Sequence, residues 1–382
     1  MTIDRPRLPA LTSLRFFAAL HVFVFHMYAM KIANDTGLAR QISSIGYVGV
    51  SFFFILSGFI LVYTYADRQT SAGEFWRARV ARIYPAYLFS LLFNAPFFFY
   101  VVLKMHPVPV PFFQWPQNHL IASCALVLSL LQSWIPGAAL AWNPPAWSLS
   151  VEAFFYLLFP ALIIWLARKR PANWLQIAVV SWIVSLAITF LYVWLRPDGV
   201  AFVDDNSFLN WLSALKFNPL VRLPEFLFGA CCGFLFLRGK IDRKWATPLI
   251  LGGLAYFAVI VATANRIPYP ILHDAALTPA FAAIIFGIAF RPNWTRVLEI
   301  APLILLGEAS YSFYLLHAGL IGMIFNPTGE PMHPSVLRFI LGLVIPVGIS
   351  ILVFKLIEQP ARRKLRGKKK PSPELTQAVA TA

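Results

Sequence analysis

Three ionisable side chains stand inside the first apolar stretch of the sequence, residues 11–30: Arg15, His21 and His26. A charged group at the centre of a bilayer costs about 2.5–3.5 kcal/mol on insertion scales, so each such group in an apolar span suggests a function. Arg15 and His26 are eleven residues apart, close to three helical turns, and would lie on one face about 16 Å apart. Burial keeps a histidine neutral and therefore basic. The spacing predicts a buried base in line with a cation, whereas His21, on another face, is interpreted as structural.

A carboxylate stands in similar apolar surroundings further along the chain. Ser148, Glu152 and Tyr156 follow at intervals of four residues, which places them on one side of a helix. His26 and Glu152 could then form a catalytic pair, in which His26 takes the proton of an attacking hydroxyl and Glu152 orients the imidazole. A covalent intermediate on His26 is an equally consistent route. The alternative is a structural Glu152 paired with an arginine such as Arg222.

Weaker candidates for contacts with the substrate come from two segments. Ser310, Tyr314 and His317 share one helical face, and His317 is either a site residue or a histidine bonded across helices for packing. Ser148, Ser150, Tyr314 and His317 are the predicted substrate-binding side chains, because hydroxyl and imidazole groups can hold an acceptor or a developing oxyanion.

Arginines cluster before the third apolar segment. Arg79 and Arg82 are one turn apart and could grip phosphates as a fork, with Arg77 assisting. Together with Arg15 they are the predicted binding residues for an anionic donor. The alternative is a membrane anchor, because any cytoplasmic loop collects arginines. The three cysteines lack ligand spacing, so no metal site is expected.

Two further sets of side chains carry simpler expectations. Arg222 and Glu225 are three residues apart and could pair on one helix. Glu358, near the end of the last apolar segment, is interpreted as part of a local ion pair. The remaining histidines fall in predicted outer loops and carry no expected role: His106, His119, His273 and His333.

The composition identifies the elements that must hold these groups. Of 382 residues, 59% are hydrophobic and 13% charged, and the mean hydropathy is +0.69. Soluble domains carry about 25% charged residues. Apolar segments long enough to be considered as spans begin near Leu11, Gly46, Ala81, Asn118, Trp147, Trp174, Leu220, Ala246, Ala276, Ala301 and Val336. The fold class is therefore an all-α polytopic membrane protein.

The charges set the predicted topology. The net charge of +16 fits basic cytoplasmic loops better than nucleic-acid binding, and Arg5 and Arg7 place the N-terminus inside. The later basic clusters fall inside only if Asn118–Trp134, which lies among prolines, does not cross. We expect about ten transmembrane helices plus one re-entrant or interfacial segment, with both termini cytoplasmic. Residues 1–363 would form this domain, and residues 364–382 a disordered basic and polar tail.

These stretches resemble, in order, the acyltransferase-3 family of bacterial inner-membrane O-acyltransferases, over roughly Leu11 to Arg362. The resemblance is carried by Arg15 and His26, Gly49–Phe59, Arg79 and Arg82 before Tyr84-Pro85, Trp147–Glu152, Ser310–His317, and Glu358–Arg362.

The resemblance implies a multi-pass protein of the bacterial inner membrane that moves an acyl group from cytosolic acyl-coenzyme A to a carbohydrate hydroxyl. The donor would be acetyl-coenzyme A in most relatives, and no cofactor would be bound permanently. Typical acceptors are exopolysaccharide, lipopolysaccharide O-antigen and peptidoglycan, although some relatives acylate macrolides. Several relatives carry an additional hydrolase-like domain after the membrane part, whereas this sequence ends some twenty residues past its last predicted span. We therefore expect this protein to acylate its acceptor itself or to pass the acyl group to polysaccharide-assembly proteins.

A transporter or flippase for a sugar-linked or acyl substrate is the alternative from another class, because intramembrane His and Glu can also pass protons. The sequence shows no internal repeat of the kind that many transporters have, and its titratable groups gather around one predicted site. Both features favour the enzyme.

Overall fold

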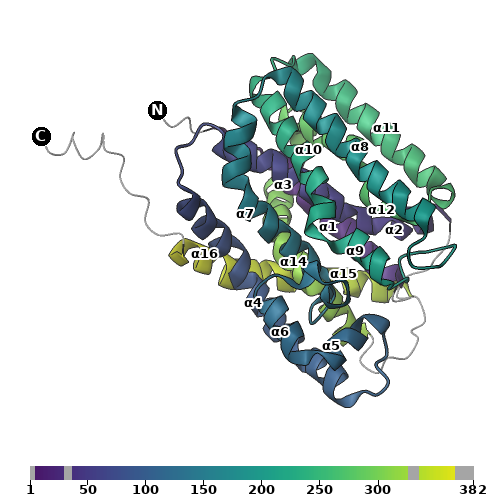
Figure 1. Cartoon of the computed structure of the whole chain (residues 1–382). Helices are drawn as coiled ribbons and strands as arrows, with labels where there is room; N and C mark the ends of the chain where they lie inside the picture. The colour runs from purple at the N-terminus through teal and green to yellow at the C-terminus, as the bar shows by residue number, and fades with distance from the viewer. Residues whose placement is uncertain (1–4, 30–36, 326–334, 366–382) are drawn as a thin grey trace, which may run out of the picture.

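The computed structural model describes residues 5–29, 37–325 and 335–365, and within them it contains helices and no β-strand (Figure 1). The helices of the first half are α1 (Pro9–Ala29), α2 (Gly37–Ser44), α3 (Gly49–Tyr65), α4 (Ala72–Lys104), α5 (Gln114–Asn118), α6 (Leu120–Leu128), α7 (Trp147–Ala167) and α8 (Pro171–Leu195). Those of the second half are α9 (Asn210–Phe217), α10 (Pro219–Arg238), α11 (Ala246–Thr263), α12 (Tyr269–Asp274), α13 (Thr278–Ala289), α14 (Ala301–Phe325), α15 (Val336–Val353) and α16 (Gln359–Leu365).

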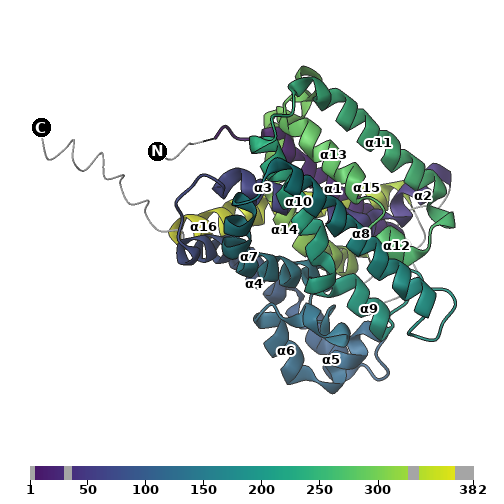
Figure 2. The same cartoon turned by 45° about the horizontal axis from the view of Figure 1, so that its top comes forward.

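Ten helical segments of this described part are long and apolar enough to cross a membrane. This confirms the predicted all-α polytopic fold. An even number of crossings brings the two ends of a chain to one side, and α1 begins and α16 ends on the same side in both views (Figures 1 and 2). The predicted tail, residues 364–382, lies outside the described residues except for its first two, which complete α16.

The segment predicted not to cross is folded as short pieces. Helix α6 has nine residues and is about 14 Å long, roughly half the thickness of a hydrocarbon core. The 3₁₀ turns Gln132–Trp134, Pro136–Ala138 and Pro144–Ala146 lead from it to α7. Figures 1 and 2 show α5 and α6 together at one edge of the molecule, beside α4. The prediction of one inserted segment is therefore confirmed.

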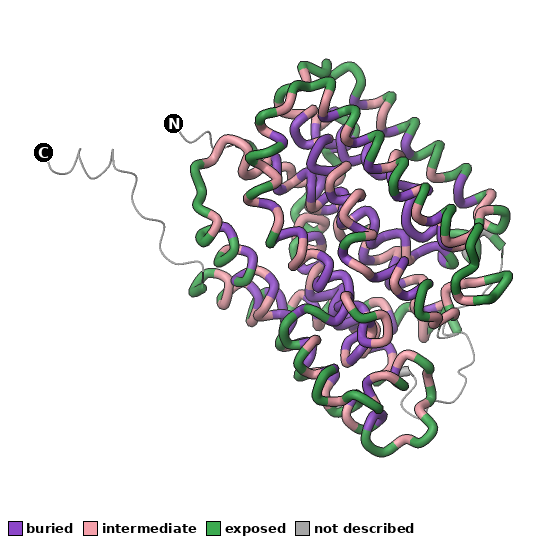
Figure 3. Tube along the Cα trace, viewed as in Figure 1, coloured by how far each residue is buried: buried purple, intermediate pink, exposed green. Residues whose placement is uncertain are grey.

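Helices α3 and α10 pack tightly at the centre, where the trace in Figure 3 is mostly buried. Glycine makes this approach possible: a Cβ on Gly58 would lie 2.1 Å from the carbonyl oxygen of Phe226, and one on Gly229 would lie 2.0 Å from that of Ile55. Small residues at helix contacts of this kind are typical of membrane proteins, because van der Waals packing drives their association.

Helix α4 begins earlier than the sequence analysis placed it. The third span was expected to start near Ala81, after a loop holding the arginines. In the structure Ser71 and Glu74 form a capping box, in which the Ser71 hydroxyl accepts from the Glu74 N–H and the Glu74 carboxylate accepts from the Ser71 N–H. Arg77, Arg79 and Arg82 consequently project from a helix whose geometry fixes their spacing.

Candidate functional site

The first part of the candidate site lies where α1 packs against α14. His26 of α1 faces His317 of α14: Nε2 of His317 lies 3.3 Å from Nδ1 of His26, and the ring centroids are 4.9 Å apart at 69°. The rings of Phe23 and Phe313, with centroids 5.3 Å apart, pack beside this pair. His317 is buried and His26 is partly exposed, so the pair can be reached only from the side of His26.

The hydrogen bonds of this pair identify the free nitrogen of His26. Nδ1 of His26 lies 2.8 Å from the carbonyl oxygen of Val22, and Nδ1 of His317 lies 2.8 Å from that of Tyr314. Because a carbonyl oxygen only accepts, each Nδ1 carries the proton in the neutral rings. Nε2 of His317 is then an acceptor facing the Nδ1–H of His26. Nε2 of His26 keeps an unshared lone pair with no partner in the described part of the chain.

A hydroxyl pair extends the site from α14 to α7. The Ser148 hydroxyl lies 3.0 Å from that of Tyr314 and also 3.2 Å from the carbonyl oxygen of Pro145. The structure thus brings Ser148, Tyr314 and His317 together, as their predicted role requires. Ser150 points elsewhere, because its hydroxyl accepts from the backbone N–H of Ser133 and anchors the inserted segment to the start of α7.

A second cluster, of charged groups, surrounds Glu152. The Tyr156 hydroxyl donates to Glu152 at 3.1 Å, as the four-residue spacing predicts. Arg15 and Arg82 both interact electrostatically with Glu152 and with Glu358. Glu358 is buried, and the hydroxyl of Ser312 on α14 donates to it at 2.9 Å.

Glu358 ends a π-helical turn, Phe354–Glu358, that connects α15 with α16. Turns of this type break the regular helical register and are frequent at functional sites. Glu358 was expected to form a local ion pair; it interacts electrostatically with Arg362, four residues on, and also with Arg82 and Arg15 of the charge cluster.

The predicted contact between His26 and Glu152 is not formed. No hydrogen bond or ion pair joins them within the described ranges, where His26 is held by Val22 and His317, and Glu152 by Tyr156. The helix geometry explains why. The hydroxyls of Ser148 on α7 and Tyr314 on α14 are in contact and mark a common level. Glu152 lies one turn from this level along α7, and His317 lies one turn from it along α14 in the opposite direction. The separation of Glu152 and His317 along the helix axes is therefore about 10 Å.

Arg79 is held in an aromatic cage. Its guanidinium lies 5.6–5.7 Å from the ring centroids of Tyr65, Phe75 and Tyr156, and it donates to the Tyr65 hydroxyl at 3.2 Å. Such contacts position a cation while leaving it able to attract an anion. Arg77 is exposed.

A cavity of about 240 Å³ adjoins this cage and shares Tyr65 and Phe75 with it. Its other lining residues are mostly apolar, apart from Arg68 and Thr70: Ala66, Arg68, Thr70, Ala72, Phe159, Pro160, Ile163, Ile164 and Ala167. Of the predicted donor-binding arginines, Arg79 therefore stands next to a mostly apolar cavity that could hold a flat ring.

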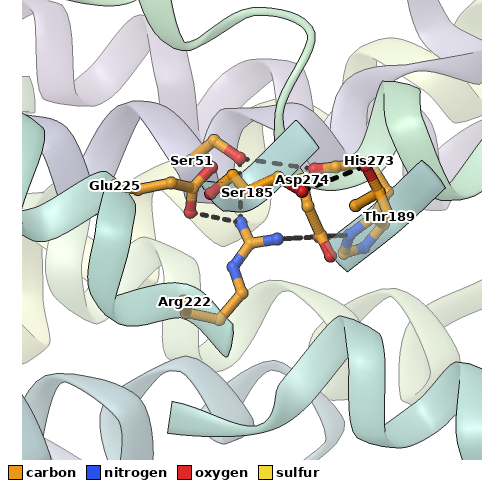
Figure 4. Close-up of polar contacts among 7 residues, drawn as sticks. All are labelled: Ser51, Ser185, Thr189, Arg222, Glu225, His273 and Asp274. Atoms are coloured by element: carbon orange, nitrogen blue, oxygen red, sulfur yellow. Dashed lines mark hydrogen bonds and ion pairs between the residues drawn. The ribbon is translucent and has the colours of Figure 1, made fainter. Parts of the chain in front are cut away.

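Figure 4 shows a third polar network, which sequence reasoning found only in part. Arg222 of α10 pairs with Glu225 at 2.8 Å, as their spacing predicted, so it is not a partner of Glu152. Arg222 also pairs with Asp274 and donates to the Ser51 hydroxyl at 2.8 Å. His273 was expected in an outer loop without a role, but it is buried in α12 beside Asp274. The network joins α3, α10 and α12.

His21, interpreted as structural, links α1 to α2: its Nε2 donates to the carbonyl oxygen of Ile42 at 2.7 Å. Among the residues that the structure describes, no group of three or more His, Cys, Asp or Glu side chains could hold a metal ion.

Comparison with known proteins gives one family match. The model of a family described as an acyltransferase domain matches residues 8–355. Acyltransferase MdmB of Streptomyces mycarofaciens is 31% identical over 81% of this chain and 78% of its own length. O-acetyltransferase OatA of Staphylococcus aureus is 25% identical over 94% of this chain, and peptidoglycan O-acetyltransferase OatA of Listeria monocytogenes is 26% identical over 94%. The chain spans little more than half of the length of these OatA proteins, 57% and 56%. No solved structure matches the chain.

Proposed function

The chain belongs to this acyltransferase family, and from that premise we propose that it transfers an acyl group from acyl-coenzyme A to a hydroxyl of a carbohydrate. It is a multi-pass membrane protein, and its relatives are named as acyltransferases, two of them as O-acetyltransferases. Acetyl is the proposed acyl group, and an exported or cell-surface carbohydrate at a bacterial inner membrane is the proposed acceptor. The observation that carries the proposal is the free Nε2 of His26.

The proposed reaction uses His26 as the base. Nε2 of His26 takes the proton of the acceptor hydroxyl while the hydroxyl oxygen attacks the thioester carbonyl carbon. The carbon–sulfur bond breaks, and the departing thiolate takes the proton back from the imidazolium, so coenzyme A leaves as a free thiol. His317 is a positioning residue: it accepts from Nδ1–H of His26 and so holds Nε2 toward the reactants. The Tyr314 hydroxyl, bonded to Ser148, would donate to the oxyanion.

The donor would reach His26 from the arginine end of the site. Arg79 and Arg82, with Arg77 at the surface, would hold its phosphates, and the apolar cavity beside Phe75 would take the adenine ring. Arg15 would then guide the pantetheine arm along α1 toward His26, about 16 Å away.

Glu152 has a proposed role different from the one expected from the sequence. Its electrostatic contacts are with Arg82 and Arg15, so it would hold these two arginines along the donor path. A carboxylate is needed there because two arginines at close range repel each other in an apolar environment. Glu358 would assist from the other side.

The test uses the purified protein in proteoliposomes with acetyl-coenzyme A on the side of the arginines and a neutral sugar acceptor on the other. We expect release of free thiol together with acetylated sugar, both absent with His26→Ala. Passage of unmodified sugar through the vesicle without any thiol release would support the transporter alternative instead. Mass spectrometry of the quenched protein distinguishes direct transfer from an acyl-His26 intermediate, because only the second leaves a transient mass increase on the chain.

A further inference from the structure

A second cavity, of about 230 Å³, lies outside the site described above, between the inserted segment and α9. The turn Pro136–Ala138 contacts both α5 and α9 at this place. Its lining residues are aromatic, amide, hydroxyl and small groups: Pro111, Phe112, Gln114, Trp115, Asn118, Pro136, Gly137, Leu140, Phe208, Asn210, Ser213 and Phe217. None of them is charged.

The chemistry of this lining selects a class of ligand. Aromatic rings present a negative face against which the C–H groups of a sugar ring can pack. Side-chain amides such as those of Asn118 and Asn210 both donate and accept, so they suit hydroxyl groups that do the same. No cation is part of the lining, because Lys216 lies against the lining rings of Phe208 and Phe217 and does not itself line the cavity. The lining therefore favours a neutral ligand over phosphates and carboxylates. We propose that this cavity binds an uncharged sugar ring of the acceptor.

One wall of the cavity depends on a glycine. A Cβ on Gly137 would lie 2.7 Å from the Trp115 ring, so only glycine lets this indole lie against the turn at Pro136–Ala138. The preceding turn, Gln132–Trp134, is anchored to the start of α7, because Ser133 donates to the carbonyl oxygen of Trp147 at 2.7 Å. The aromatic wall is thus built on a fixed support.

A series of packed side chains links the cavity to the proposed reaction centre. Phe217, in its lining, packs on Trp147 with ring centroids 4.9 Å apart. Trp147 precedes Ser148, whose hydroxyl is bonded to Tyr314 next to His317. In the proposed arrangement the acceptor chain would extend from this cavity past Trp147 and Ser148 toward His26. The identification of the ligand as the acceptor rests on the proposed function, whereas the binding of a neutral sugar does not.

The test measures binding without any acyl donor, so that it is independent of catalysis. The protein is placed in lipid nanodiscs, because maltoside detergents carry a neutral disaccharide head group that would compete. Saturation-transfer NMR with methyl β-D-glucopyranoside and N-acetylglucosamine should show transfer to the protein, and glucuronate should show little. Trp115→Ala should weaken the binding at least tenfold, and Gly137→Ala, which displaces the same ring, should weaken it as well.

The matched control is Phe202→Ala, which removes an aromatic ring that is 81% exposed between α8 and α9 and does not line the cavity. It should leave sugar binding unchanged. The proposal is overturned if the wild-type protein binds neither neutral sugar, or if Trp115→Ala binds them as the wild type does while its thermal unfolding is unaltered. His26→Ala should retain sugar binding; loss of acyl transfer with intact binding would separate the cavity from the proposed reaction.

Discussion

Replacing Gly307 with alanine should disable the enzyme without unfolding it, because this glycine sets the distance between α1 and α14. A Cβ at Gly307 would lie 2.1 Å from the carbonyl oxygen of Thr12 and 2.9 Å from the Cα of Ser13, both backbone atoms of α1. An ordinary contact begins near 3.4 Å, so the two helices must separate by roughly 1.3 Å. The helices carry His26 and His317, which are 3.3 Å apart. A displacement of about 1 Å at a reaction centre can lower the rate about 100-fold.

The assay is the rate of thiol release from acetyl-coenzyme A with a sugar acceptor, measured for protein that elutes as a folded species. Overpacking of this kind costs about 1–3 kcal/mol of stability, so a modest drop in the unfolding temperature is expected. The control is Gly322→Ala in the same helix, where a Cβ would meet nothing within 4 Å. Full activity in Gly307→Ala, or an equal loss in Gly322→Ala, would refute the claim that the packing of α1 on α14 sets the geometry of the histidines.

Three further substitutions test separate parts of the account. Arg82→Ala should raise the apparent Michaelis constant for the acyl donor about tenfold or more and leave that for the acceptor unchanged; an effect confined to the acceptor would contradict the placement of the donor. His317→Phe removes one hydrogen bond to His26 and should lower kcat by up to about tenfold at unchanged donor affinity. A loss as complete as that of His26→Ala would instead make His317 the base. Arg222→Ala leaves two buried carboxylates, one of them Glu225, without their cation and should cost about 3–5 kcal/mol; an unchanged unfolding temperature would show that the network does not stabilise the fold.

The spans were predictable because bilayer thickness fixes helix length and because basic residues follow a topological rule. The sequence also carried the local pairs, since helix geometry brings residues three or four positions apart together. Tyr156 meets Glu152 and Arg222 meets Glu225 for this reason. The early start of α4 was equally present in the sequence as a serine followed three residues later by a glutamate, Ser71 and Glu74.

The contacts between helices were not predictable in the same way. His317 is 291 residues from His26. The spacing of residues within one helix does not indicate which other helix a side chain will face. Asp274 lies in a six-residue helix, too short to leave a periodic pattern, so its pairing with Arg222 had no signal in the sequence. The depth of Glu152 relative to His26 likewise depends on how α7 and α1 are each set against α14.

The most direct test of the account is a single-turnover reaction of radiolabelled acetyl-coenzyme A and a sugar acceptor with wild-type protein and with His26→Ala. Binding of the donor is measured in parallel by equilibrium dialysis. We predict that His26→Ala binds the donor as the wild type does but releases no thiol and forms no labelled sugar above background. Acetylated sugar formed by His26→Ala at a rate within tenfold of the wild type would contradict the assignment of His26 as the base.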